Sequence, residues 1–173
     1  MNGSSISGSP FVAGHHPSAT VIDASGRFLF VANRGSADVS VFAIDAKNGS
    51  LTEISGSPFA ASKGADALAL DVTGSYLFVA GHDANEVVVF RIDGEGGTPT
   101  LLGRTALQAA GPSSLVVDPS GQYLYVTSDK TGGVTTLNLD VFSGTLTRGA
   151  DARSPGRASS IVVASRAATA QAR

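Results

Sequence analysis

Three ionisable residues of different chemistry recur at almost constant spacing along this 173-residue chain. Arg34, His82 and Asp129 are separated by 48 and then 47 residues. An imidazole can act as the general base that activates water, and a guanidinium can stabilise a developing oxyanion, so this set could support hydrolysis at a carbonyl carbon. If the spacing reflects a structural repeat, the three side chains should lie at one end of the fold.

Two further series follow the same spacing. Asp38 and Glu86 are 48 residues apart, and His16, Gly64, Gly111 and Arg157 follow one another at 48, 47 and 46 residues. We expect the second series to lie just before the first strand of each unit, close to a central channel. The candidate catalytic residues are therefore His16, His82 and Glu86, and the candidate substrate-binding residues are Arg34, Asp38 and Arg157.

A simpler interpretation stays open for every one of these residues: they are solvated loop charges with no part in chemistry, as loops carry in most proteins. The adjacent pair His15 and His16 has no third ligand near it in the sequence, which argues against a metal site. We expect neither a metal nor another cofactor.

The repeat itself is carried by the segments that must position these residues. Residues 23–32 read DASGRFLFVA, residues 71–80 read DVTGSYLFVA, and residues 118–127 read DPSGQYLYVT. Each Asp can accept hydrogen bonds from nearby backbone N–H groups, and each Gly supplies the left-handed position of a tight turn. Asp23, Asp71 and Asp118 are therefore predicted to form turns at the opposite end from the candidate site.

Each unit of 46 to 48 residues reads as four short strands separated by turn residues, and no window of ten or more residues has a convincing helical period. Apolar runs such as residues 28–32 and 87–90 do not alternate with polar residues, which indicates strands covered on both faces. A four-stranded antiparallel sheet repeated at this length is typical of a β-propeller blade. The sequence thus predicts an all-β partial propeller of about three and a half blades.

The expected boundaries follow from the same alignment. We predict blades at about residues 18–62, 66–108 and 113–150, a further inner strand at 158–164, and a disordered tail at 165–173. Because propellers close with about 4 to 8 blades, we expect either a missing half upstream or a head-to-tail homodimer. The exposed faces of the end blades are expected to contain Val21, Val31 and Val41 at one end and Val116, Val126 and Leu137 at the other, or the alternating neighbours of these residues.

Composition excludes several classes of function. Charged residues make up 15% of the chain and the net charge is −2, so nucleic-acid binding is not expected. No apolar run approaches about 18 residues, so no membrane span is expected. The absence of cysteine leaves the compartment open: cytoplasmic, or extracytoplasmic if a signal peptide lies upstream.

Several motifs resemble the YVTN and lactonase group of seven-bladed propellers, which includes 6-phosphogluconolactonases. They are DPSGQYLYVTS at 118–128, FLFVAN at 28–33, VSVFAID at 39–45, and NGSLT at 48–52 followed by GSPF at 56–59. The resemblance covers roughly residues 8–164 and implies a hydrolase that opens sugar lactones. Relatives of this type often carry Gly-Pro-Arg-His before a first strand and Asn-Glu after a second strand, and neither signature is present here.

Two functions are consistent with the sequence. One is hydrolysis of a sugar lactone such as 6-phosphogluconolactone by the complete ring. The other is a non-catalytic propeller scaffold of the YVTN type that binds a protein or a carbohydrate. The expected partner is accordingly a small lactone, a carbohydrate or a protein.

Overall fold

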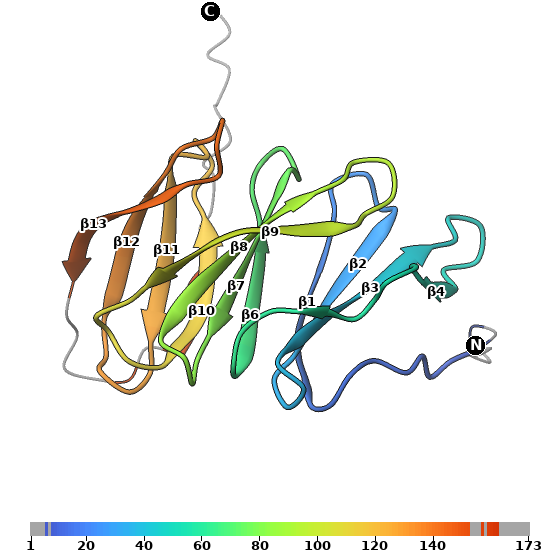
Figure 1. Cartoon of the computed structure of the whole chain (residues 1–173), viewed down its shortest axis with the longest axis horizontal. Helices are drawn as coiled ribbons and strands as arrows, with labels where there is room; N and C mark the ends of the chain where they lie inside the picture. Colours follow the sequence, from blue (N-terminus) through green and yellow to red (C-terminus); the bar gives the residue numbers. More distant parts are fainter. Residues whose placement is uncertain (1–5, 7, 153–156, 158, 163–173) are drawn as a thin grey trace, which may run out of the picture.

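The computed structural model describes residues 6, 8–152, 157 and 159–162, and within them three antiparallel sheets stand side by side (Figure 1). Blade 1 contains β1 (Pro17–Ile22), β2 (Phe28–Asn33), β3 (Asp38–Ile44), β4 (Leu51–Glu53) and β5 (Phe59–Ala60). Blade 2 contains β6 (Ala65–Leu70), β7 (Tyr76–Gly81), β8 (Glu86–Ile92) and β9 (Pro99–Ala106). Blade 3 contains β10 (Pro112–Val117), β11 (Tyr123–Ser128), β12 (Val134–Leu139) and β13 (Leu146–Ala152).

The prediction of an all-β partial propeller is confirmed. No helix occurs in the described residues, and none of them could form a helical membrane span. Consecutive strands pair as antiparallel neighbours in blades 2 and 3 and from β1 to β4 in blade 1, where β5 pairs with β3 instead. The first strand of each blade also carries the same irregularity in its pairing, between Pro17 and Ala19, between Ala65 and Ala67, and between Pro112 and Ser114.

The repeated aspartates form the turns that the sequence predicts. The Asp71 carboxylate accepts hydrogen bonds from the backbone N–H of Thr73 at 3.0 Å and of Tyr76 at 2.7 Å. Asp23 and Asp118 accept the equivalent bonds from residues two and five positions further on. These bonds fix the register between the first and second strands of each blade.

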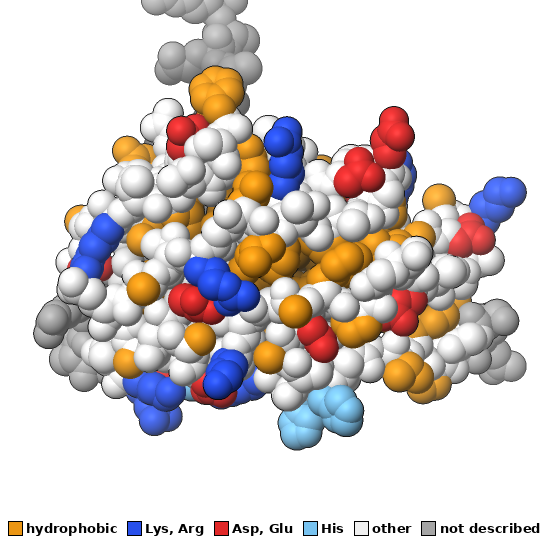
Figure 2. All heavy atoms as spheres, in the orientation of Figure 1, with side chains coloured by type: hydrophobic (Ala, Val, Ile, Leu, Met, Phe, Trp, Pro, Cys, Tyr) orange, Lys and Arg blue, Asp and Glu red, His pale blue; other side chains and the backbone are white. Residues whose placement is uncertain are grey.

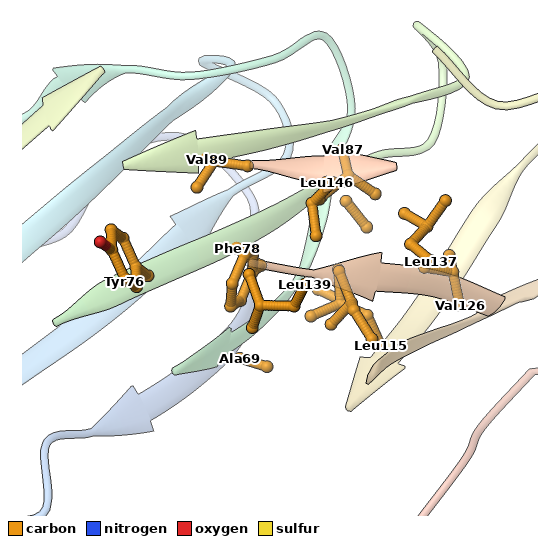
Figure 3. Packing of buried hydrophobic residues seen from close by; sticks show 13 residues of the cluster. Ala69, Tyr76, Phe78, Val87, Val89, Leu115, Val126, Leu137, Leu139 and Leu146 are labelled. Atoms are coloured by element: carbon orange, nitrogen blue, oxygen red, sulfur yellow. The ribbon is translucent and has the colours of Figure 1, made fainter. Parts of the chain in front are cut away.

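Apolar side chains between the blades form the core. One cluster joins blades 1 and 2 and includes Phe30, Val41, Leu77 and Val88. The second joins blades 2 and 3 and contains the residues drawn in Figure 3, among them Phe78, Val89, Val126 and Leu137. The central strand β7 is buried along its whole length, which explains why its sequence lacks polar alternation.

Two details differ from the prediction. The fourth strand of blade 1 is split into β4 and β5, because the turn at residues 54–58 interrupts its pairing with β3. Residues 159–162 of the expected inner strand at 158–164 are not in a strand, since their described contact with β10 is a single bond of 3.4 Å from the Ile161 N–H to Ser114 Oγ rather than a ladder. Residues 158, 163 and 164 and the tail expected at 165–173 lie outside the described residues.

Candidate functional site

The loop that precedes the first strand of each blade lies against the loop between the second and third strands. The Arg34 N–H donates to the His16 carbonyl at 3.0 Å, and the corresponding bonds in blades 2 and 3 join His82 to Gly64 at 2.8 Å and Asp129 to Gly111 at 2.9 Å. The candidate residues of all three blades thus share one end of the fold, which we call the mouth.

A positive φ at one position of each blade shapes this contact. The φ angle is +67° at Gly64 and +71° at Gly111, and His16 adopts the same conformation with φ at +52°. A Cβ atom at Gly64 would lie 2.8 Å from Asp83. The backbone therefore favours glycine at position 64, and the neighbouring Asp83 side chain leaves no room for a Cβ atom.

In blade 1 the glycine of this loop contact is on the other loop. His16 carries a side chain where blades 2 and 3 have glycine, and the facing residue is Gly35 rather than Asp83 or Lys130. The exchange leaves His16 exposed at the mouth. Figure 2 shows exposed histidine side chains at the lower edge of the molecule.

A buried histidine joins the loops of blades 2 and 3. His82 Nδ1 lies 2.7 Å from Asp83 Oδ1, and Nε2 lies 3.1 Å from Asp129 Oδ1. Only 7% of the His82 side chain is exposed, whereas 29% of the Asp129 side chain is. The ring is therefore held between two carboxylates with little access to solvent.

Arg34 connects blade 1 to the same group. Its Nη1 lies 3.2 Å from Asp66 Oδ1 on β6, and its Nη2 lies 3.2 Å from His82 Nδ1. The shorter Asp83 contact identifies Nδ1 as a donor to Asp83, and the guanidinium forms ion pairs with Asp66 at 3.2 Å and with Asp83 at 3.8 Å. We call Arg34, Asp66, His82, Asp83 and Asp129 the mouth cluster.

The geometry of His82 bears on its protonation. A neutral imidazole has a single N–H and could donate to one of the two carboxylates, whereas an imidazolium donates to both. The hydrogen bond from His82, followed by the positive charges of His82, Arg34 and Lys130, holds the pKa of Asp83 below its ordinary value although partial burial opposes this. The lowered pKa of Asp83 fits an ionised carboxylate beside the ring.

Two predicted site residues are engaged elsewhere. Glu86 Oε1 pairs with Arg104 and accepts a hydrogen bond from Ser62 Oγ at 2.7 Å. Asp38 Oδ1 accepts from Asn33 Nδ2 at 2.7 Å and from Ser36 Oγ at 3.0 Å. Neither carboxylate has a described contact with the mouth cluster.

The remaining two candidates, His16 and Arg157, are exposed. No hydrogen bond or ion pair joins either side chain to another residue in the described part of the chain. The structure therefore brings Arg34 and His82 together, and the roles assigned to His16, Glu86, Asp38 and Arg157 stay predictions.

Asp66 and Asp83 are absent from the predicted site. Asp66 occupies the position of Ser18 in blade 1 and Ser113 in blade 3, so a departure from the repeat was the signal that could have identified it. Asp83 adjoins His82 in sequence, but the bond between two consecutive side chains depends on the local loop conformation. Across residues 6, 8–152, 157 and 159–162, no group of three or more His, Cys, Asp or Glu side chains could hold a metal ion.

Comparison with known proteins identifies the family. The model of the seven-bladed β-propeller lactonases matches residues 6–61 and 54–163. The chain belongs to this lactonase family. No curated protein sequence matches it.

Solved structures agree with this assignment. A Pseudomonas aeruginosa periplasmic gluconolactonase is 25% identical with a TM-score of 0.72, and the match covers 83% of this chain and 40% of that protein. A Bacteroides fragilis protein named as a candidate 6-phosphogluconolactonase is 27% identical with a TM-score of 0.72, over 80% of this chain and 39% of that protein. A Lactobacillus plantarum protein at 22% identity and a TM-score of 0.77 supports the fold, over 87% of this chain and 45% of that protein. The chain thus spans less than half the length of these structures.

Proposed function

We propose that this chain forms part of a lactonase-type hydrolase that opens a sugar lactone, such as 6-phosphogluconolactone or gluconolactone, in a complete propeller ring. The observation that carries the proposal is the contact of Arg34, His82 and Asp129 at the mouth of a lactonase-family blade set. These repeat-equivalent residues supply a guanidinium and a carboxylate that each lie within hydrogen-bond distance of the His82 imidazole.

Lactone hydrolysis adds water to the carbonyl carbon and breaks the ring C–O bond, which leaves a hydroxy acid. His82 Nε2 would accept the proton from water once Asp129 moves away from it, and Arg34 would stabilise the oxyanion or a phosphate group. His16 is a second candidate base and Arg157 a second candidate cation, since both are exposed. Glu86 and Asp38 would contribute only if the site rearranged.

A hydrolysis assay tests this proposal. The chain is assayed with glucono-1,5-lactone and with 6-phosphogluconolactone over a range of protein concentrations, against the spontaneous rate. We expect catalysed hydrolysis that rises faster than linearly with concentration, because one chain supplies only part of the mouth. His82→Gln should lower the rate by about 100-fold or more, as is usual for loss of a general base.

The matched control is Arg148→Gln, which removes an exposed arginine of β13 that pairs with Asp151 away from the mouth cluster. Hydrolysis that survives both His82→Gln and Arg34→Gln would contradict the assigned site. A folded chain without activity at any concentration would contradict the enzymatic proposal.

A non-catalytic scaffold is the second candidate. The observation that favours it is the burial of His82 between two carboxylates, which occupies both ring nitrogens and leaves neither free for a substrate. A folded but inactive chain would support this alternative.

A further inference from the structure

The mouth cluster contains a contact that depends on the second proton of a buried imidazole. Asp83 belongs to the same loop as His82, whereas Asp129 belongs to the loop between β11 and β12 in the next blade. The bond from Nε2 to Asp129 is therefore the ion pair that links these two loops across the mouth. A second bond, 2.9 Å from the Gly111 N–H to Asn85 Oδ1, joins the β7–β8 loop to the segment that enters β10 and does not depend on the imidazole.

We propose that His82 is a pH-dependent clamp of the mouth. In its doubly protonated form it ties the β7–β8 loop to the β11–β12 loop through Asp129. When it loses one proton, it releases Asp129 and leaves Nε2 as an unpaired hydrogen-bond acceptor.

The proton that is lost follows from the two distances. Nδ1 is closer to its carboxylate, at 2.7 Å against 3.1 Å for Nε2, so the Asp83 bond is retained. An unprotonated Nε2 would then face the Asp129 oxygen lone pair to lone pair, with 93% of the His82 side chain shielded from water that could separate them. Asp129 is more exposed than His82 and can turn toward solvent.

Several charged groups surround the ring. Asp83 and Asp129 contact it directly, and Asp66 pairs with Arg34 beside it. Arg34 lies on the Nδ1 side, and Lys130 adjoins Asp129 in the sequence. Among the described ion pairs, only that of His82 with Asp129 joins the β7–β8 loop to the β11–β12 loop, so no other described ion pair replaces it when the proton leaves.

The backbone can transmit the release. The Asp129 N–H is bonded to the Gly111 carbonyl at 2.9 Å, and a Cβ at Gly111 would lie 2.3 Å from Asp129 Oδ1. A reorientation of the Asp129 side chain therefore alters the surroundings of the segment that enters β10. The clamp would control access to the mouth, and it would mask the Nε2 base of the proposed hydrolase at low pH; the clamp itself does not require catalysis.

Nuclear magnetic resonance of the isotope-labelled chain tests the coupling. The chain has three histidines, and the other two, His15 and His16, are exposed, so the ring signals of His82 can be assigned with His15→Gln and His16→Gln variants. We expect the backbone amide signals of residues 129–133 to shift with the same midpoint as the His82 ring. Amide signals that stay unchanged while the ring titrates would overturn the proposal.

Thermal unfolding between about pH 5 and pH 8.5 gives an independent readout. The wild-type melting temperature should fall by about 2–4 °C as pH rises through the His82 titration, as expected for the loss of one hydrogen bond in a chain of this size. The melting temperature of Asp129→Asn should not fall over this pH range, although the variant stays folded. The double variant His15→Gln, His16→Gln should show the same fall as the wild type. The same decrease in Asp129→Asn as in the wild type would also refute the clamp.

Because these measurements use no substrate, they are separate from the hydrolysis assay. Loss of catalysis with an intact clamp would reject the proposed function alone. Hydrolysis without coupling between His82 and the β11–β12 loop would reject the clamp alone.

Discussion

At Asp71 one carboxylate satisfies several backbone donors that a turn would otherwise leave unpaired. The residue is only 8% exposed, and its two oxygens accept from Thr73 and Tyr76. A buried N–H that loses its acceptor is costly, and bonds to a charged group contribute more than neutral ones. The turn aspartates therefore stabilise the fold and are not candidates for catalysis.

We expect Asp71→Ala to lower the free energy of unfolding by about 2 kcal/mol, the size expected for buried bonds to a carboxylate. Urea denaturation monitored by circular dichroism measures the change. Asp45→Ala is the matched control, since Asp45 is exposed and accepts a backbone N–H from Lys47 in a similar turn. Equal losses in the two variants would contradict the role assigned to burial.

Acid stability depends on the same turns. Burial alone would raise the pKa of Asp118, but bonds from the Ser120 hydroxyl and from the N–H groups of Tyr123, Ser120 and Gln122 outweigh it and hold that pKa below its ordinary value. A carboxyl whose pKa is depressed by folding stabilises the fold above its unfolded pKa, and this contribution is lost as pH falls through the folded pKa.

We therefore expect Asp118→Asn to be less stable than wild type at pH 7 and to lose less stability on acidification below about pH 4, near the ordinary Asp pKa. Melting temperatures recorded from pH 7 to pH 2.5 would show the two curves approaching each other. Parallel curves would refute the linkage.

Among the elements, the contact between blades 2 and 3 contains a specific polar bond. The Tyr76 hydroxyl donates to the Phe142 carbonyl in the β12–β13 loop at 2.7 Å. Gly144 in the same loop packs so closely on the Tyr76 ring that a Cβ there would lie 2.6 Å away. The outer loop of one blade is thus fixed on the side chain of the preceding blade.

Tyr76→Phe removes only the hydroxyl and should destabilise the chain by about 1 kcal/mol, the usual net value of one hydrogen bond. Tyr123→Phe provides a close control, because Tyr123 is the equivalent residue of blade 3 and is 37% exposed. Chemical denaturation measures the free energy of unfolding of both variants. If Tyr123→Phe lowers it as much as Tyr76→Phe does, the stabilising role of the inter-blade bond is contradicted.

The repeat predicted the strands and turns well because their signals are local. The Asp and Gly residues that form each turn are only a few positions apart, and each uninterrupted apolar run indicates by itself a strand that is buried on both faces. The mouth cluster was predicted only where it obeyed the repeat, as Arg34 and His82 do. Asp66 was missed because its contact with Arg34 crosses between blades and depends on side-chain reach, which spacing does not encode. Glu86 follows the spacing too, but Arg104 on the adjacent strand draws it away.

At the scale of the whole molecule, blade 3 presents a sheet face without a blade against it in the described residues. The prediction for this face named Val116, Val126 and Leu137 or their alternating neighbours. Val126 and Leu137 instead pack between blades 2 and 3, and Val41 of blade 1 packs between blades 1 and 2. The open face contains the predicted Val116 and the alternating neighbours Tyr125 and Thr136. Tyr125 pairs with Val116 across β10 and β11 and with Thr136 across β11 and β12. The equivalent pair in blade 2, Phe78 and Val89, packs on blade 3.

We expect this face to associate head-to-tail with blade 1 of a second copy, because that arrangement repeats the contact that blades 1 and 2 each make with the next blade. Two copies would supply about four fifths of the length of the P. aeruginosa and B. fragilis structures. Size-exclusion chromatography with light scattering should show the mass rising with concentration from 17.3 kDa toward twice that value. Tyr125→Lys should weaken the association, whereas Leu102→Lys, an exposed residue of β9, should leave it unchanged. A mass of 17.3 kDa at every concentration, or growth beyond a dimer, would contradict the closed pair.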